Sequence, residues 1–324
     1  MKIFITGGTG FIGSHLAEAL LHRNPSDDIR CLVRSRLKWL DGKPVTPIKG
    51  DLNDIEALHE GMRDADLVFH LAAMVKAPRE ETLHHANVEG TENLVRVAQK
   101  AGVRNIVMLS SLAAAGPSFS RPLTEDDPMM PISMYGRSKK LMEEMVHRTA
   151  SSSDCITLLR PPAVYGPREE QILSFFQIAS RGICPIVGGN GESRISMVHV
   201  ADVVQALLLA AGRQKPGVHT YFVSGEDVHS WNEIKEATAA ALNRRLFTLS
   251  LPPGLVHLAG RVMESAGGLF GAYPDLNKDK AQEMTHQWTC SIEKISRDLG
   301  YSPRYSLREG ISDTIQWYKK HNWI

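Results

Sequence analysis

The chain has few cysteines, no excess of basic residues and no long apolar run. It has only four cysteines in 324 residues. Because these lie far apart and form no C-x-x-C pair, the sequence indicates neither a metal site nor a disulfide framework. Its 37 basic and 36 acidic residues nearly cancel, which argues against a nucleic-acid partner. No apolar run reaches transmembrane length and the amino terminus enters a strand at once, so we expect no signal peptide, no membrane partner and a cytoplasmic protein.

A glycine-rich turn follows the first apolar run, residues 2–5. The segment that follows this run reads TGGTGFIGSHL, with helical spacing beginning near Phe11. A strand that enters such a turn and then a helix forms a dinucleotide pyrophosphate site, since glycine lets the backbone approach the phosphates at the positive end of the helix. We therefore assign the cofactor to Gly7, Gly10, Phe11, Ile12 and Gly13. An ordinary strand-to-helix turn is the alternative.

Tyr135 and Lys139 stand four residues apart in a segment with helical apolar spacing. On a helix this spacing places both side chains on one face. A phenol has a pKa of about 10, and a neighbouring ammonium group is expected to lower it toward neutrality. Tyr135 is thereby predicted to move a proton during catalysis, although an exposed helix with an incidental Tyr and Lys has the same pattern.

Two serines, Ser110 and Ser111, end the apolar run 106–109. Hydroxyls at the carboxyl end of a parallel strand point into the crevice where ligands bind. Ser111 is expected to hydrogen-bond a substrate oxygen. For Ser110, capping of a turn is an equal alternative.

Strand-like and helix-like segments alternate through the first half of the chain. Strands are predicted near 2–6, 29–33, 45–48, 66–70, 105–109 and 155–160, and helices near 11–22, 54–61, 84–101 and 135–150. This alternation predicts an α/β fold, a Rossmann-type doubly wound parallel sheet, with a smaller carboxyl-terminal substrate lobe. We expect a dinucleotide-binding domain over 1–166, rejoined at about 194–224, and a lobe made of 167–193 and 225–324.

The order of glycine turn, strand-end serine and Tyr-x-x-x-Lys resembles the extended short-chain dehydrogenase/reductase superfamily, the NAD-dependent epimerase/dehydratase family. Further similar segments lie at 70–73, 87–94, 159–167, 196–203 and 299–318. The resemblance implies catalytic roles for Ser111, Tyr135 and Lys139, with the lysine also holding the ribose. It implies further cofactor contacts at Asp51, Leu52, Leu71, Ala72, Ala73, Asn87, Pro161 and Val164. For Asn87, capping of the next helix is the alternative. Relatives pair the helices near 84–101 and 135–150, which implies a homodimer.

The end of the second strand bears on the choice of nicotinamide cofactor. An NAD site usually has an acidic residue there for the ribose 2′-hydroxyl, whereas a 2′-phosphate is bound by a guanidinium. This chain has Arg34, with Arg36 and Lys38 close behind. NADP is therefore favoured over NAD, although exposed basic loop residues also serve solubility.

Departures from the family patterns discriminate between reactions on a small-molecule substrate. Related dehydratases have an Asp-Glu pair after the catalytic hydroxyl, where this chain has Leu112-Ala113. Related epimerases commonly have Asn where this chain has Ala163, but Arg194 resembles an arginine that grips a nucleotide diphosphate. A surface-loop arginine or a salt bridge is the other interpretation of Arg194.

The leading hypothesis is an NAD(P)-dependent oxidoreductase that acts on a secondary alcohol or ketone, because the carboxyl-terminal segment, 279–303, and the basic strand end are most similar to the dihydroflavonol reductase and 3β-hydroxysteroid dehydrogenase branch. The alternative is a nucleotide-sugar epimerase. A third class, a cofactor-binding regulator without turnover, usually loses Tyr or Lys, and both are present here.

Overall fold

The computed structural model describes residues 1–188, 191–213, 215–269, 273–274 and 276–324. Its larger part is built on a seven-stranded sheet in the order β10-β6-β5-β4-β1-β2-β3, in which every neighbouring pair is parallel. The strands are β1 (Lys2–Thr6), β2 (Asp28–Val33), β3 (Thr46–Lys49), β4 (Leu67–His70), β5 (Asn105–Leu109), β6 (Cys155–Arg160) and β10 (Gly217–Phe222). The predicted parallel α/β fold is confirmed.

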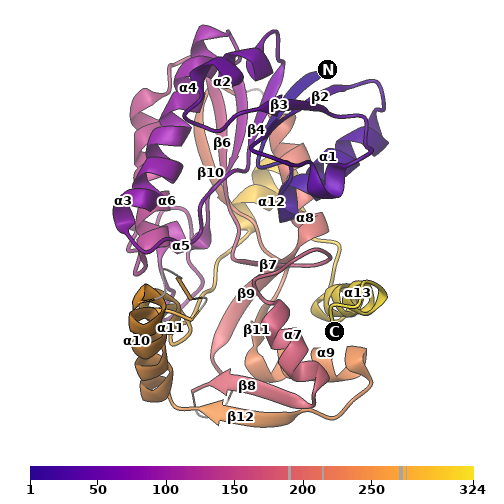
Figure 1. Cartoon of the computed structure of the whole chain (residues 1–324), viewed down its shortest axis with the longest axis vertical. Coiled ribbons are helices and arrows are strands. Elements are labelled where there is room, and N and C mark those ends of the chain that lie inside the picture. The colour runs from indigo at the N-terminus through magenta and orange to yellow at the C-terminus, as the bar shows by residue number, and fades with distance from the viewer. Residues whose placement is uncertain (189–190, 214, 270–272, 275) are drawn as a thin grey trace.

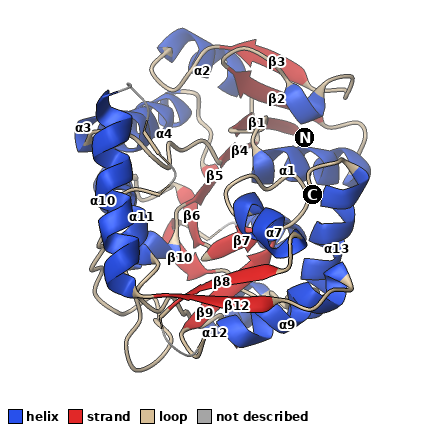
Figure 2. Cartoon of the chain, turned by 60° about the horizontal axis from the view of Figure 1, so that its bottom comes forward, coloured by secondary structure: helices blue, strands red, loops and turns tan. Residues whose placement is uncertain are grey.

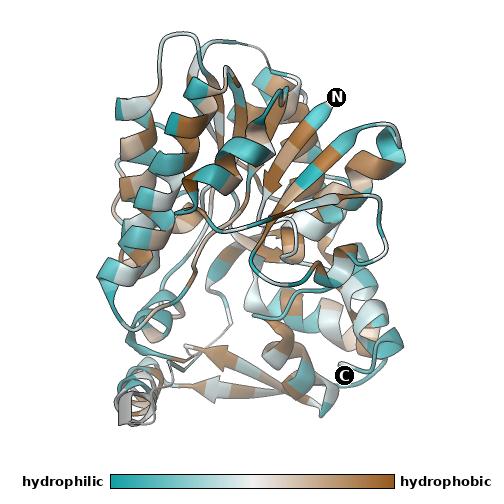
Figure 3. Ribbon diagram, turned by 45° about the horizontal axis from the view of Figure 1, so that its top comes forward, coloured by the Kyte–Doolittle hydropathy of each residue, from teal (hydrophilic) through white to brown (hydrophobic). Residues whose placement is uncertain are grey.

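Helices cover both faces of this sheet (Figures 1 and 2). One face packs on α1 (Phe11–Arg23), α8 (Val200–Ala211) and α12 (Glu293–Leu299), and the other on α2 (Ile55–Met62), α4 (Gly90–Lys100) and α6 (Met134–Thr149). Both faces are covered because the strands are apolar on both sides. In β1, for example, Ile3 and Ile5 pack in the core on one face and Phe4 packs in the core on the other. Figure 3 shows hydrophobic residues along these strands and hydrophilic ones on the outer helix faces.

The strand order reverses beside β1, because β2 and β3 lie on one side of it and β4 on the other. Ligands of open α/β sheets bind at such a reversal, outside the carboxyl ends of the strands. The glycine turn after β1 and the loop after β4 both lie at this place.

The smaller part lies below the large sheet in Figure 1. It contains a three-stranded sheet of β7 (Ala163–Tyr165), β9 (Arg194–His199) and β11 (Val228–Ser230), and a two-stranded parallel sheet of β8 (Ile183–Val187) and β12 (Phe247–Leu251). Its helices are α7 (Leu173–Ser180), α9 (Trp231–Leu242), α10 (Pro253–Leu269), α11 (Lys278–Glu283) and α13 (Leu307–Lys320).

The chain passes between the two parts more often than we expected. In the returning segment 194–224, α8 packs on α1 and β10 extends the large sheet, whereas β9 pairs with β7 and β11. Ile295 and Tyr301, within the segment predicted for the lobe, pack in the core of the large sheet. The predicted domain boundaries stay a prediction. Among the described helices none has the length and apolarity needed to cross a membrane.

Candidate active site

The turn after β1 requires glycine at two positions. Gly7 has φ of +74°, and a Cβ there would lie 2.6 Å from the backbone nitrogen of Ala72. A Cβ on Gly13 would lie 2.1 Å from the Gly7 carbonyl oxygen, so only glycine lets α1 start so close to the strand. Gly10, the N-cap, offers no side-chain acceptor to the first turn. The close-packed glycine turn and the free backbone N–H groups at the start of α1 fit a bound pyrophosphate. Phe11 and Ile12 lie in this first turn of α1.

The loop after β4 lies against this turn. The Leu71 N–H donates to the Thr6 carbonyl over 3.0 Å, and Gly7 faces the peptide between Leu71 and Ala72. Ala72 is half-buried and Ala73 exposed. The predicted cofactor segments 7–13 and 71–73 therefore form one continuous edge, although the sequence separates them by nearly sixty residues.

Asn87 holds this loop in place, and the helix-capping alternative is wrong. It lies inside a π-helical turn, His85–Glu89, between α3 (Glu80–His84) and α4, with a side chain that is buried. Its carboxamide accepts from the Met74 N–H and donates to the Met74 carbonyl, both at 2.8 Å, and donates to the Ser138 hydroxyl at 3.0 Å. Asn87 thus joins the loop after β4 to α6.

His70, at the end of β4, supports the same edge. Its Nδ1 lies 2.7 Å from the Thr6 hydroxyl and its Nε2 lies 2.9 Å from the Thr91 hydroxyl. Burial, reinforced by the charge of Lys139, lowers its pKa to about 3. The ring is therefore neutral at physiological pH and acts as a structural hydrogen-bonding group.

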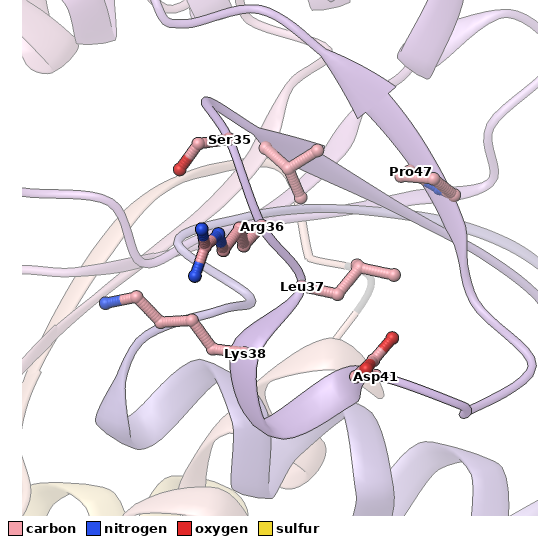
Figure 4. Close-up of a pocket in the computed structure, with 7 residues that line it drawn as sticks. Ser35, Arg36, Leu37, Lys38, Asp41 and Pro47 are labelled. Carbon is pink, nitrogen blue, oxygen red and sulfur yellow. The ribbon is translucent and has the colours of Figure 1, made fainter.

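The end of β2 carries the basic residues predicted to select the cofactor. Arg34 is exposed directly after the strand. The next residues line a hollow of about 400 Å³, in which Arg36 and Lys38 reach toward one side and Asp41 lies on the other (Figure 4). Across the β3 end, exposed Asp51 accepts from the Asn53 N–H at 2.8 Å, and the half-buried Leu52 packs against Gly90 of α4.

Ser111 and Tyr135 lie together at the carboxyl end of β5. Ser111 caps the short helix α5 (Leu112–Ala115), accepting from the Ala113 N–H at 3.1 Å. Tyr135 lies in the first turn of α6, which begins behind the N-cap Ser133. The Ser111 side chain lies near enough to the Tyr135 phenol to act on it. The two residues predicted to contact the reacting oxygen thus adjoin one another.

The pKa of Tyr135 differs from the expectation. Burial raises it to about 12, the Ser111 hydrogen bond offsets part of this, and the charge of Glu283 raises it further. The expected lowering by Lys139 is wrong, because its ammonium group is turned toward β5, where Nζ donates to the Leu109 carbonyl at 2.7 Å. Tyr135 is therefore protonated at neutral pH.

Lys139 is itself almost completely buried, at 1% exposure. Burial lowers its pKa to about 8, although the nearby carboxylate of Glu143 opposes the shift. A lysine with this pKa changes charge within the range where enzymes work.

Ser110 has a partner that the sequence did not indicate, so its capping alternative is wrong. Its hydroxyl hydrogen-bonds the buried carboxylate of Glu143, one helical turn beyond Lys139. Glu143 also accepts from Arg160 at the end of β6, at 2.9 Å from Nε and 2.6 Å from Nη2. This ion pair is about 5% exposed or less on each side and joins β5, β6 and α6 below the candidate site.

Helix α11 of the smaller part covers the start of α6. Asp279 accepts from the Met134 N–H at 2.6 Å, and Glu283 acts on the pKa of Tyr135. We did not predict these two acidic residues, since no spacing in the sequence relates them to residues nearly 150 positions earlier.

The remaining predicted residues lie apart from one another. The Pro161 carbonyl accepts from the Leu112 N–H at 2.8 Å, beside Ser111. Val164 lies on β7, paired with Val198. Arg194 begins β9 and is exposed, and its charge acts on the carboxylate of Glu233.

Comparisons with known proteins support one family. The model of the NAD dependent epimerase/dehydratase family matches residues 3–224. The chain is similar to the ceramide reductase of Caulobacter vibrioides, at 30% identity over 99% of this chain and 96% of that protein. It is also similar to the 4-hydroxy-2-methyl-3-oxo-4-farnesyl-3,4-dihydroquinoline-1-oxide ketoreductase of Stigmatella aurantiaca, at 32% identity over 96% of this chain and 95% of that one.

Among solved structures, MoeE5 in complex with UDP-glucuronic acid and NAD is similar over 99% of this chain and 100% of its own, with a TM-score of 0.77 and 27% identity. The relatives thus include reductases and a protein that binds a nucleotide sugar. Because the family model matches about two thirds of the chain, which also has the glycine turn after β1, the chain belongs to the NAD-dependent epimerase/dehydratase family of the extended short-chain dehydrogenase/reductase superfamily.

Proposed function

We propose that this protein is an NAD(P)-dependent oxidoreductase that interconverts a ketone and a secondary alcohol. The observation that carries the proposal is that Ser111, just after β5, adjoins Tyr135 closely enough to act on its phenol, with Lys139 one turn further along the helix of Tyr135. When bound, the nicotinamide supplies or accepts the hydride. Ser111 and Tyr135 would hold the oxygen of the reacting carbon between them.

The protonation state of Tyr135 near neutral pH suits the proton donation that ketone reduction requires. A phenol with a pKa of about 12 carries its proton, so Tyr135 is ready to donate to a developing alkoxide. Donation leaves a phenolate, which the ammonium of Lys139 stabilises while it remains charged. Ser111 donates a second hydrogen bond to the same oxygen and fixes its position.

The residues after Ser111 and two similar proteins favour an apolar ketone as the substrate. Leu112 and Ala113 stand where an acid and base for elimination would be needed, so water is not removed. The ceramide reductase and the quinoline-oxide ketoreductase reduce substrates with long apolar parts, as their names indicate. Both are similar over nearly the whole chain, which supports an apolar ketone for this protein.

Nucleotide-sugar epimerisation is the second candidate. The likeness to MoeE5 with UDP-glucuronic acid supports it, as does exposed Arg194 on β9. Epimerisation would use the same hydride step transiently.

We assign NADP as the preferred cofactor. The support is the basic group at the end of β2, where exposed Arg34 is followed by Arg36 and Lys38 beside a hollow. The relative MoeE5 holds NAD, so the preference must be measured. A cytoplasmic homodimer, paired through the outer faces of α4 and α6, is part of the same proposal.

A substitution that removes only the phenol oxygen tests the proposal. Tyr135→Phe should keep the Kd for NADPH and lower ketone reduction by about 10²- to 10⁴-fold, because only the proton donor is lost. Tyr305→Phe, a matched change on a half-buried tyrosine elsewhere, should leave turnover unchanged. Retained turnover in Tyr135→Phe would remove this residue from the mechanism. Strong thermal stabilisation of the wild type by a UDP-sugar would favour the epimerase instead.

A further inference from the structure

The outer face of the two-stranded sheet is apolar and uncovered. Phe247 is 77% exposed, Leu249 50% and Ile183 41%, and Ile183 pairs with Phe247 across the strands. The residues between them point inward: Cys184 and Ile186 of β8 are buried against α7 and α9. The alternation that buries one face of this sheet therefore presents large hydrophobic side chains on the other.

Helix α10 follows β12 directly and has an uncovered apolar stripe of its own. Leu255, Leu258 and Val262 are each 57–58% exposed, and their spacing of three and four residues places them on one side of the helix. The opposite side packs on α11, since a Cβ on Gly260 would lie 2.7 Å from the Asn277 carbonyl oxygen. Figures 1 and 2 show α10 and β12 together at one end of the molecule.

Positive charge surrounds these apolar residues. Arg181 and Arg245 are exposed at the starts of β8 and β12, and Arg244 lies between them, with its Nε 3.6 Å from where a Cβ on Gly182 would be. Lys235 of α9 also contacts this sheet, because its Nζ donates a hydrogen bond to the Thr248 hydroxyl of β12 at 2.7 Å. Between Glu236 and Glu264 the sequence has three arginines and no acidic residue. Cationic side chains thus border the apolar residues.

We propose that the outer face of β8 and β12 together with the outer stripe of α10 is a docking surface for an anionic lipid membrane. Large exposed apolar side chains beside arginines match the chemistry of the lipid interface, with acyl chains below and anionic headgroups above. The contact is peripheral and requires no spanning helix, but it departs from our expectation from the sequence that the protein has no membrane partner. Helix α10 packs on α11, which covers the start of α6, so docking would place the candidate site close to the membrane.

The surface stands independently of the proposed reductase activity. If the substrate is an apolar ketone, docking at this face would let the protein take it from the bilayer. If the activity differs, the binding is unchanged, because no residue of the candidate site takes part in it.

Vesicle flotation of the full chain tests the proposal. We expect wild-type protein to float with vesicles of equal parts phosphatidylcholine and phosphatidylglycerol, far less with pure phosphatidylcholine, and less as salt is raised. Phe247→Ser combined with Leu258→Ser should weaken binding at least about tenfold, since two inserted apolar side chains are lost. Arg245→Glu should weaken binding to the anionic vesicles alone.

Ile55→Ser is the matched control. Ile55 is 40% exposed on α2, at the other end of the molecule, so its loss should leave flotation unchanged. Circular dichroism verifies that each variant is folded. Wild-type protein that fails to float with either vesicle, or an Ile55→Ser defect as large as that of the double variant, would overturn the proposal. A dimer in solution that the double variant dissociates would also overturn it, because the surface would then bind a second copy.

Discussion

The ammonium group of Lys139 donates a hydrogen bond to the carbonyl oxygen of Leu109 over 2.7 Å, which holds the lysine against the carboxyl end of β5. Both residues are buried, so the charge lies in a low-dielectric place, on the helix that also carries Tyr135. This position explains why the lysine has a lowered pKa while the tyrosine does not. In the proposed mechanism Lys139 therefore acts on the phenolate that forms after proton donation, while the resting phenol keeps its proton.

The first prediction concerns the pH dependence of ketone reduction. Lys139 has a pKa of about 8 and Tyr135 of about 12, so Lys139 loses its proton first as pH rises. We expect kcat/KM for reduction to fall above about pH 8, because neutral lysine no longer stabilises the phenolate. A profile that stays level until the tyrosine titrates would contradict this role of Lys139.

The second prediction is that Lys139→Met gains stability while it loses activity. Folding lowers the pKa of Lys139 from 10.5 to about 8, so the unfolded state binds the proton more tightly. Stability therefore rises as pH increases from about 8 toward 10.5, and below that window the buried charge costs ~3 kcal/mol. Removing it should stabilise the fold at neutral pH by about 1–2 kcal/mol, after the lost hydrogen bond is subtracted.

Urea unfolding at neutral pH measures this gain. Lys100→Met, at an exposed position of α4, should change stability by less than about 0.5 kcal/mol. A loss of stability in Lys139→Met would show that the hydrogen bond to Leu109 outweighs the cost of burying the charge.

The third prediction concerns the ion pair of Glu143 and Arg160. Glu143→Met should lower the free energy of unfolding by about 3–5 kcal/mol, because it leaves a buried guanidinium without its partner. Adding Arg160→Met should restore part of the loss, since the guanidinium is then gone, while the buried ammonium of Lys139 still lacks the Glu143 carboxylate. Glu92→Met, which breaks the exposed pair with Arg96, should cost less than about 1 kcal/mol. Equal losses at the buried and exposed pairs would contradict the interpretation.

The fourth prediction is that Arg34→Asp shifts the cofactor preference from NADPH toward NADH. A cation that pairs with the 2′-phosphate is replaced by a carboxylate that repels it. Losing a hydrogen bond between charged groups costs about 1.5–3 kcal/mol, which raises the Kd for NADPH by about one to two powers of ten. The Kd for NADH should change far less.

The Kd values of both cofactors, measured in the wild type and the variant, decide this prediction. Arg23→Asp makes the same charge change at the far end of α1 and should alter neither Kd. If the wild type already binds NADH more tightly, or if Arg34→Asp raises both Kd values equally, Arg34 is a solvated loop residue that does not select the cofactor.

Local patterns in the sequence were enough to place most elements of the large sheet. The predicted strands 2–6, 105–109 and 155–160 match β1, β5 and β6, because apolar runs between turn residues are read from neighbouring positions alone. The glycine turn and the four-residue spacing of Tyr135 and Lys139 are local in the same sense. A helix on which the two residues share a face follows from the sequence without knowledge of the rest of the fold.

The surroundings of those residues follow from the packing of distant elements and could not be read from the sequence. The partner of Ser110 lies on α6, the acidic residues near Tyr135 come from α11, and Asn87 contacts Met74 from within a π-helical turn. None of these pairings has a spacing that the sequence marks, since they are set by which elements pack together. Burial, which the composition does not reveal, also reversed the expected pKa shift of Tyr135. Local sequence patterns were sufficient for the elements and the candidate site residues. Packing set their contacts and their protonation, because desolvation and long-range contacts exist only in the folded chain.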